Sequence, residues 1–109
     1  MPPTSAVPIT VSSDAKEFIA EAALGEPFQQ MLERTLQGVP GLRTVNVTLM
    51  IFYDEDNRPC VEIEAMSNLP FSEAHTLQGE LNRWRHDTFP MQVCEHFYLT
   101  VSPRADDAR

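Results

Sequence analysis

The sequence predicts an α+β fold, a two-layer sandwich with the element order α-β-β-α-β. Three observations predict it. Apolar residues recur every three to four positions in residues 14–38 and 72–86, the spacing of one helix face. Apolar and other residues alternate in residues 45–53 and 60–66, as in a half-buried hairpin. Alternation returns in residues 93–101, so we expect a three-stranded mixed sheet with helices on one face.

The first two helices are delimited by capping and breaking residues. Asp14 and Glu17 have the spacing of a capping box, which predicts the start of the first helix. Gly25-Glu26-Pro27 separates it from the second helix, because proline is favoured in a first helical turn. Gly38 and Pro40-Gly41 then end the second helix.

The hairpin and the last strand each have one apolar face. The apolar positions expected to share the core face are Val45, Val47, Leu49, Ile51, Tyr53, Val61, Ile63, Ala65, Phe97, Leu99 and Val101. Between these strands, residues 72–86 form a helix with Ser72 as the predicted N-cap. The crossover makes the last strand parallel to its partner, which we expect to be the strand carrying Glu62. The opposite sheet face stays free of helices, as an antiparallel hairpin permits.

Length and charge limit the classes of protein. The 109 residues make one domain, expected over 13–103, with a flexible arm over 1–12 and a disordered tail over 104–109. Alternatively, residues 7–11 of this arm form an edge strand of the sheet. The formal net charge of −8 argues against nucleic-acid binding. The apolar-leaning run Thr44–Tyr53 is half the length of a membrane span, and no signal peptide is apparent. We therefore expect a complete cytoplasmic protein without a membrane span.

The chain from about Glu26 to Pro103 resembles the cytosolic C-terminal domain of cation diffusion facilitators, a family of dimeric metal transporters. The residues that carry the resemblance are Pro40-Gly41-Leu42, Ala74-His75, Phe89-Pro90 and Pro103. The resemblance implies a metallochaperone-like (ferredoxin-like) layout and a homodimer in which two copies form a V. No six-helix membrane domain precedes the matching segment, so we expect the chain not to transport metal itself.

Two candidate metal ligands follow from the resemblance. It implies His75 on the helix and Glu62 on the second strand as ligands. At other family ligand positions this chain has Asn46, Thr100 and Ser102, so the family's usual binuclear centre is not expected intact.

Two further candidate ligands follow from the residues themselves. Cys94 and His96 are two apart on the expected last strand, so they share a face about 7 Å apart. With Glu62 or Cys60 on the neighbouring strand, they are placed to reach one ion. Thiolate, imidazole and carboxylate suit Zn²⁺, with Cd²⁺ or another divalent transition metal as the alternative. The other interpretation is that Cys94 and His96 are packing residues on a dimer-facing surface.

The sequence therefore predicts a cytosolic domain that binds divalent metal, acts as a homodimer and serves in buffering or regulation. Its expected partners are metal ions, a second copy and a separate metal transporter. No nucleophile motif is present, so no enzyme activity is expected. Two alternatives stay open. One is a metal-independent interaction or dimerisation domain. The other is a small ferredoxin-like enzyme or ligand-binding dimer, favoured if 7–11 is a strand.

Overall fold

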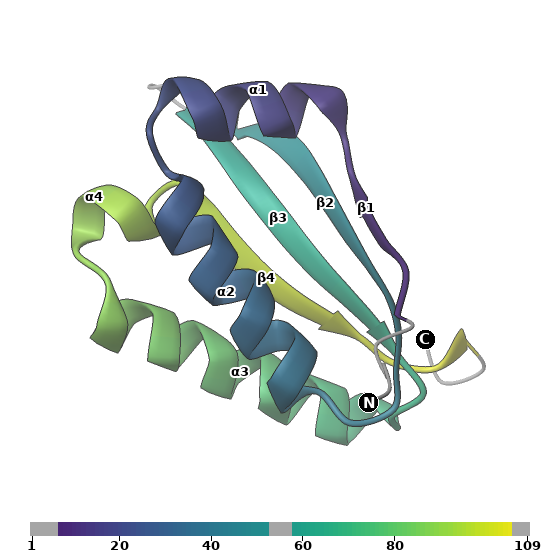
Figure 1. Cartoon of the computed structure of the whole chain (residues 1–109). Helices are drawn as coiled ribbons and strands as arrows, with labels where there is room; N and C mark the ends of the chain where they lie inside the picture. Colours follow the sequence, from purple (N-terminus) through teal and green to yellow (C-terminus); the bar gives the residue numbers. More distant parts are fainter. Residues whose placement is uncertain (1–6, 53–57, 106–109) are drawn as a thin grey trace, which may run out of the picture.

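A four-stranded mixed sheet, covered by helices on one face, makes up the protein (Figure 1). The computed structural model describes residues 7–52 and 58–105. Its elements are β1 (Ile9–Val11), α1 (Ser13–Glu21), α2 (Gly25–Gly38), β2 (Leu42–Phe52), β3 (Arg58–Ser67), α3 (Phe71–Thr88), α4 (Met91–Cys94) and β4 (Phe97–Ser102). The strands lie in the order β1-β2-β3-β4, and only β2 and β3 pair antiparallel. The α+β class is therefore confirmed.

The prediction of three strands was wrong, because Ile9–Val11 form a short strand at the sheet edge beside β2. Ile9 aligns with Val45 in a parallel pair. Pro8, which argued against a strand, precedes it. Its carbonyl oxygen accepts from the Val45 N–H at 3.0 Å, a distance typical of a ladder bond. Residues 9–11, which were expected to belong to the flexible arm, thus form a strand, and residues 1–6 lie outside the described part of the chain.

Two β-α-β units meet at the central hairpin. With β1 included, the element order is β-α-α-β-β-α-α-β, which matches the ferredoxin-like alternative β-α-β-β-α-β except that each connection has two helices. The ferredoxin-like layout is nevertheless not confirmed, because such a fold has split β-α-β units, whereas β1 lies next to β2 and β3 next to β4. The predicted parallel pairing of the last strand is confirmed, with Glu62 of β3 aligned with Tyr98 of β4.

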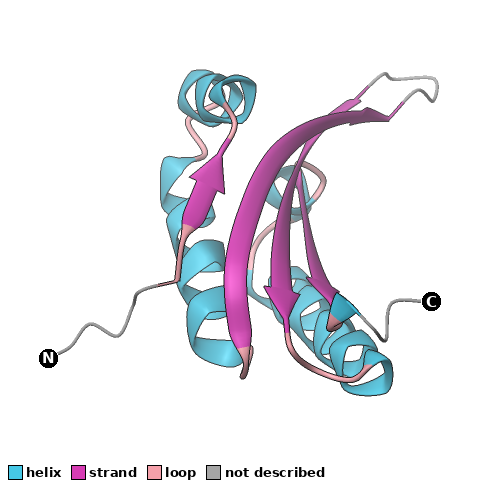
Figure 2. Ribbon diagram, turned by 90° about the vertical axis from the view of Figure 1, so that its right-hand side faces the viewer, coloured by secondary structure: helices cyan, strands magenta, loops and turns pink. Residues whose placement is uncertain are grey.

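One face of the sheet and three helices bury a single core. The predicted alternation is confirmed by the strand residues that are almost inaccessible to solvent: Val45, Val47, Val61, Ile63, Ala65, Phe97, Leu99 and Val101. It fails at the end of β2, where Ile51 is 46% exposed, and Tyr53 lies outside the described residues. The helices add Ala15, Ile19, Met31, Leu32, Ala74 and Leu81. Burying one large apolar side chain contributes about 1.5–3 kcal/mol, so this cluster determines which face the helices cover. In the side view of Figure 2 the strands are strongly curved, with α1 and α2 to their left.

Two helix starts differ from the predicted ones. Ser12, rather than Asp14, is the N-cap of α1. Its hydroxyl accepts from the Ala15 N–H at 3.3 Å and donates to the Asp14 carboxylate at 2.6 Å, so one side chain satisfies a helix donor and anchors an acidic residue. The third long helix begins directly after Pro70, and Ser72 lies in its first turn instead of capping it.

The segment before β4 is a short helix and not the predicted strand over 93–101. The Cys94 N–H donates to the carbonyl of Pro90 at 3.0 Å, and the His96 N–H donates to that of Val93 at 3.1 Å. These bonds turn the chain through α4, so β4 begins only after His96. Cys94 and His96 therefore do not share one strand.

The chain ends were predicted only in part. The backbone N–H of Arg104 donates to the Leu69 carbonyl at 2.9 Å, so the expected disordered tail does not begin at residue 104. Residues 106–109, like Tyr53 and the hairpin loop through residue 57, lie outside the described ranges. Among the helices of residues 7–52 and 58–105, none is long and apolar enough to cross a membrane.

The outer edge of β4 is closed by side-chain amides from α3. Asn82 donates to the Leu99 carbonyl at 2.7 Å and accepts from the Leu99 N–H at 3.2 Å. Gln78 accepts from the Val101 N–H at 3.0 Å. An edge strand otherwise presents unpaired N–H and C=O groups. The two amides take the place of a neighbouring strand and hold α3 along the edge of β4.

We expect Asn82→Ala to lower the free energy of unfolding by about 1–3 kcal/mol, because it leaves both backbone groups of Leu99 without their partner. Asn68→Ala is the matched control, since Asn68 is exposed and its side chain makes no hydrogen bond within the described structure. The control should change stability by less than about 0.5 kcal/mol. Urea denaturation followed by circular dichroism measures both, and equal losses would contradict the role given to Asn82.

Candidate functional site

The sheet face opposite the core is uncovered and carries one of the predicted ligands, Glu62. The buried apolar residues of α1, α2 and α3 all belong to the core on the other face. We call the uncovered surface the open sheet face and define it by Asn46, Thr48, Met50, Glu62, Glu64, Met66, Tyr98, Thr100 and Ser102. These residues alternate along β2, β3 and β4 with the core residues, as the sequence predicted.

Two carboxylates occupy the centre of the open sheet face. Glu62 and Glu64 are half-buried on the central strand β3. They lie two residues apart, which separates their α-carbons by about 7 Å. The Thr100 hydroxyl donates to Glu62 Oε2 at 3.1 Å, and the Ser102 hydroxyl donates to Glu64 Oε2 at 2.7 Å. Neither carboxylate forms an ion pair within residues 7–52 and 58–105. One oxygen of each is thus held by β4, while its charge has no cation beside it.

Apolar and sulfur-containing side chains surround the two carboxylates. Met50 and Tyr98 are 39% and 40% exposed. The Asn46 side-chain amide donates to the sulfur of Met66 at 3.3 Å, and Gln78 of α3 donates to the Tyr98 hydroxyl at 3.3 Å. Tyrosine and methionine are enriched in protein interfaces because they offer large contact areas. The open sheet face therefore combines contact area with uncompensated charge.

The predicted ligand His75 lies on α3 and not on the sheet. It is exposed one turn after the start of the helix, where its ring stacks on Phe71 with centroids 5.9 Å apart and planes 15° from parallel. Glu62 lies on the open sheet face. In the described parts of the chain, no three His, Cys, Asp or Glu side chains come close enough together to hold a metal ion.

Cys94 is a buried structural residue at the junction of α3 and α4. Its side chain is 3% exposed, and its thiol donates to the carbonyls of Arg85 at 3.3 Å and Phe89 at 3.5 Å. Its own carbonyl accepts from Nη1 of Arg85 at 2.7 Å. The sulfur is therefore directed at backbone groups of α3 and its C-terminus.

His96 is held in an orientation that suits a ligand. Its Nδ1 lies 3.2 Å from the Pro59 carbonyl, which can only accept, so Nδ1 carries the proton in the neutral ring. A metal-binding imidazole commonly donates its other nitrogen to a carbonyl in this way. The free Nε2 lies 3.9 Å from the Glu95 carboxylate, which is also 3.8 Å from Nη1 of Arg58. Phe18 packs edge-on against the imidazole at 5.4 Å.

Sequence reasoning missed Arg85, the buried charged residue of the described structure. The side chain is 6% exposed. Its Nε donates to Asn82 Oδ1 at 3.0 Å, and its Nη2 lies 3.4 Å from Nε2 of His86. A spacing signal was present, because Gln78, Asn82 and Arg85 are four and three residues apart and so share one helix face. Glu64 was also missed, because the resemblance assigned no ligand role to that position.

Cys60 is a second buried thiol, at the start of β3. Burial raises the pKa of the Cys60 thiol above its ordinary value of 9.0 and outweighs the opposing effect of Arg85 and Arg58. The nearby carboxylate of Glu62 raises the pKa further. Because metals bind the thiolate, a thiol that keeps its proton is a weak ligand at neutral pH.

We expect the free energy of unfolding to fall more steeply above pH 9 in the parent protein than in Cys60→Ala. In the unfolded chain the thiol loses its proton near pH 9.0, whereas the folded protein retains it to higher pH. The unfolded state then binds fewer protons, so stability is lost as pH rises. Urea titrations at several pH values from 7 to 10.5 measure the difference. Parallel curves for parent and variant would contradict the raised pKa.

No protein-family model matches the chain, and no curated protein or solved structure matches it either. The resemblance to the cation diffusion facilitator domain therefore rests on short sequence motifs and their spacing, and it stays a prediction.

Proposed function

We propose that this chain is a cytosolic binding domain that pairs with a second copy through the open sheet face, with a divalent cation linking the two copies. One observation carries the proposal. Glu62 and Glu64 are half-buried carboxylates at the centre of an uncovered sheet face, and they have hydroxyl donors but no cation beside them within the described chain. A buffering or regulatory role, with a separate metal transporter as a further partner, belongs to the same proposal.

The two carboxylates explain why pairing would need a cation. A two-fold dimer brings the same surface of both copies together, so four carboxylates share one interface. Two like charges about 4 Å apart repel by about 1 kcal/mol in water and about 4 kcal/mol where water is partly excluded. A divalent ion removes this repulsion and takes carboxylate oxygens as ligands. Thr100 and Ser102 already hold one oxygen of each carboxylate, which leaves the other oxygens for the ion.

The ligands of the open sheet face are oxygen atoms, which changes the expected metal. Carboxylates and hydroxyls suit Mg²⁺, Ca²⁺ and Mn²⁺, whereas the predicted Zn²⁺ or Cd²⁺ was based on a thiolate and imidazoles. His96 is the best candidate ligand for Zn²⁺. Its Nδ1 contacts a backbone carbonyl, which leaves Nε2 beside Glu95 to bind the ion. A group from outside the single chain would have to complete either site.

The second candidate function is a metal-independent interaction domain whose partner carries lysine or arginine side chains. The same two carboxylates favour it, since a basic side chain neutralises Glu62 or Glu64 as a metal ion does. The formal net charge of −8 extends this attraction over the surface. The two functions differ in whether the chain pairs with itself.

We expect the protein to sediment as a monomer in chelator and as a dimer after addition of Mg²⁺, Ca²⁺, Mn²⁺ or Zn²⁺. Removing both charges in Glu62→Gln/Glu64→Gln should make the state independent of the cation, because neither the repulsion nor the ligands remain. Glu17→Gln/Glu21→Gln on α1 is the matched control, with the same charge change on exposed residues, and should behave as the parent. Sedimentation velocity at several protein concentrations measures the states.

Three results would contradict this dimer. They are an equally stable dimer in chelator, an equal loss of the cation effect in both double variants, and a monomer under every condition. The last result would favour the basic partner.

We expect any Zn²⁺ binding tighter than about 0.1 mM to be lost in His96→Ala and unchanged in Cys94→Ser, because the Cys94 thiol is directed at two backbone carbonyls. Protons compete with a metal ion for an imidazole nitrogen, so binding should be weaker at pH 5.5 than at pH 7.5. Calorimetric titration at pH 7.5 and 5.5 measures this. His75→Ala and Glu62→Gln test the ligands implied by the resemblance. Loss of binding in Cys94→Ser but not in His96→Ala would show that the assignment to His96 is wrong.

A further inference from the structure

The helix layer contains a groove between α2 and α3, separate from the open sheet face. Two adjoining hollows of about 300 and 370 Å³ share Leu77 and Glu80 in their walls, so they form one continuous depression. The deeper end lies against Gly38 of α2 and Leu81 of α3, and the other end runs past Pro40. We propose that this groove binds a basic amphipathic helix of a partner protein.

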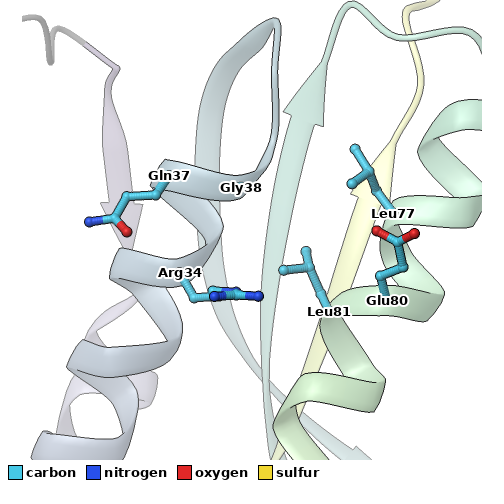
Figure 3. Close-up of a pocket in the computed structure, with 6 residues that line it drawn as sticks. All are labelled: Arg34, Gln37, Gly38, Leu77, Glu80 and Leu81. Carbon is cyan, nitrogen blue, oxygen red and sulfur yellow. The ribbon is translucent and has the colours of Figure 1, made fainter.

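The groove combines apolar and polar lining residues. Leu77 and Leu81 of α3 form the apolar part, and Arg34 points toward Leu81 from α2 (Figure 3). Gly38 has no side chain to fill the space, since a Cβ there would meet only Leu81, at 3.9 Å. The Arg34 guanidinium lies over the ring of Trp84, 5.2 Å from its centroid. A helix that lays its apolar face between two helices is a recurring mode of peptide recognition.

The wall contributed by α3 determines the charge of the partner. Glu73 and Glu80 both line the groove and lie seven residues apart on one face of α3, about 10.5 Å from each other. Asp87, seven residues further on, continues the same face beyond the lining residues. All three are exposed, and none makes an ion pair or hydrogen bond in the part of the chain that the structure describes. Arg83 lies between two of them in sequence without pairing to either. This row of carboxylates is complementary to lysine or arginine at the same spacing on a docked helix of about 14 residues.

The other occupants of the groove fit less well. A second copy of this chain has a formal net charge of −8 and would bring more acidic than basic side chains to the α3 wall. A single metal ion cannot bridge carboxylates about 10.5 Å apart. The groove is also continuous over two hollows, which suits an elongated ligand.

The binding test uses an 18-residue helical peptide with leucine and alanine on one face, lysine on the flanks and no aromatic residue. Trp84 is the one tryptophan of the chain and contacts Arg34 at the groove, so its fluorescence reports occupancy. We expect a saturable change that weakens as salt is added, because exposed charge pairs are screened. The same peptide with glutamate in place of lysine should not bind. No saturation by about 1 mM lysine peptide, or equal binding of the glutamate peptide, would overturn the proposal.

Variants locate the binding site. Glu80→Lys should lower the affinity by about 3–10-fold, as expected for reversing one exposed charge pair. Glu17→Lys on α1 makes the same change in net charge and should alter affinity by less than about 2-fold. Gly38→Leu fills the groove without a change in charge and should abolish binding. Thermal melts by circular dichroism establish that each variant is folded.

The proposal is overturned by equal losses in Glu80→Lys and Glu17→Lys, or by unchanged binding to folded Gly38→Leu. A loss confined to Glu62→Gln/Glu64→Gln would also overturn it, because the peptide would then bind the open sheet face.

Discussion

The arrangement of the whole helix layer depends on how the free edge of β4 is satisfied. In a four-stranded sheet the last strand has backbone groups on one side with no strand to pair with, and buried groups of this kind are costly to leave unpaired. Asn82 and Gln78 pair with Leu99 and Val101, so α3 is fixed along the edge and not centred over the sheet. From that position α3 completes the core with Leu81 and borders α2 across a groove. The opposite face of the sheet stays uncovered.

Arg85 connects the hydrogen bonds between α3 and β4 to the short helix α4. A buried guanidinium costs several kcal/mol in lost hydration unless hydrogen bonds replace the water. Here Nε bonds to Asn82 and Nη1 to the Cys94 carbonyl, while the Cys94 thiol returns a bond to the Arg85 carbonyl. The end of α3, the short α4 and the start of β4 therefore form one hydrogen-bonded unit. The sequence made Cys94 look like a ligand, but its position in this unit gives it a structural role.

The sequence predicted the elements whose pattern is local and failed where the partner is distant. Alternation over ten residues identified β2 and β3, because one face of each is buried. Three residues of β1 are too few to show alternation, and their pairing with β2 lies far along the chain. The four residues of α4 also continue the alternation by chance, which extended the predicted last strand back to Val93. The orientation of His96 depends on a carbonyl 37 residues away, at Pro59, and no spacing rule reveals it.

The spacing of the carboxylates separates the two proposed binding surfaces. Oxygen ligands lie about 2.0–2.6 Å from a divalent ion, so carboxylates that share one ion must approach within about 5 Å of each other. The α-carbons of Glu62 and Glu64 are about 7 Å apart on one strand, and each carboxylate is held by a different hydroxyl of β4. In the proposed dimer a second copy would supply further carboxylates, which would make cation binding and pairing interdependent on the open sheet face. The carboxylates along α3 are spaced at about 10.5 Å, which is too far for them to bind one ion. They therefore favour a long ligand that carries several separate positive charges.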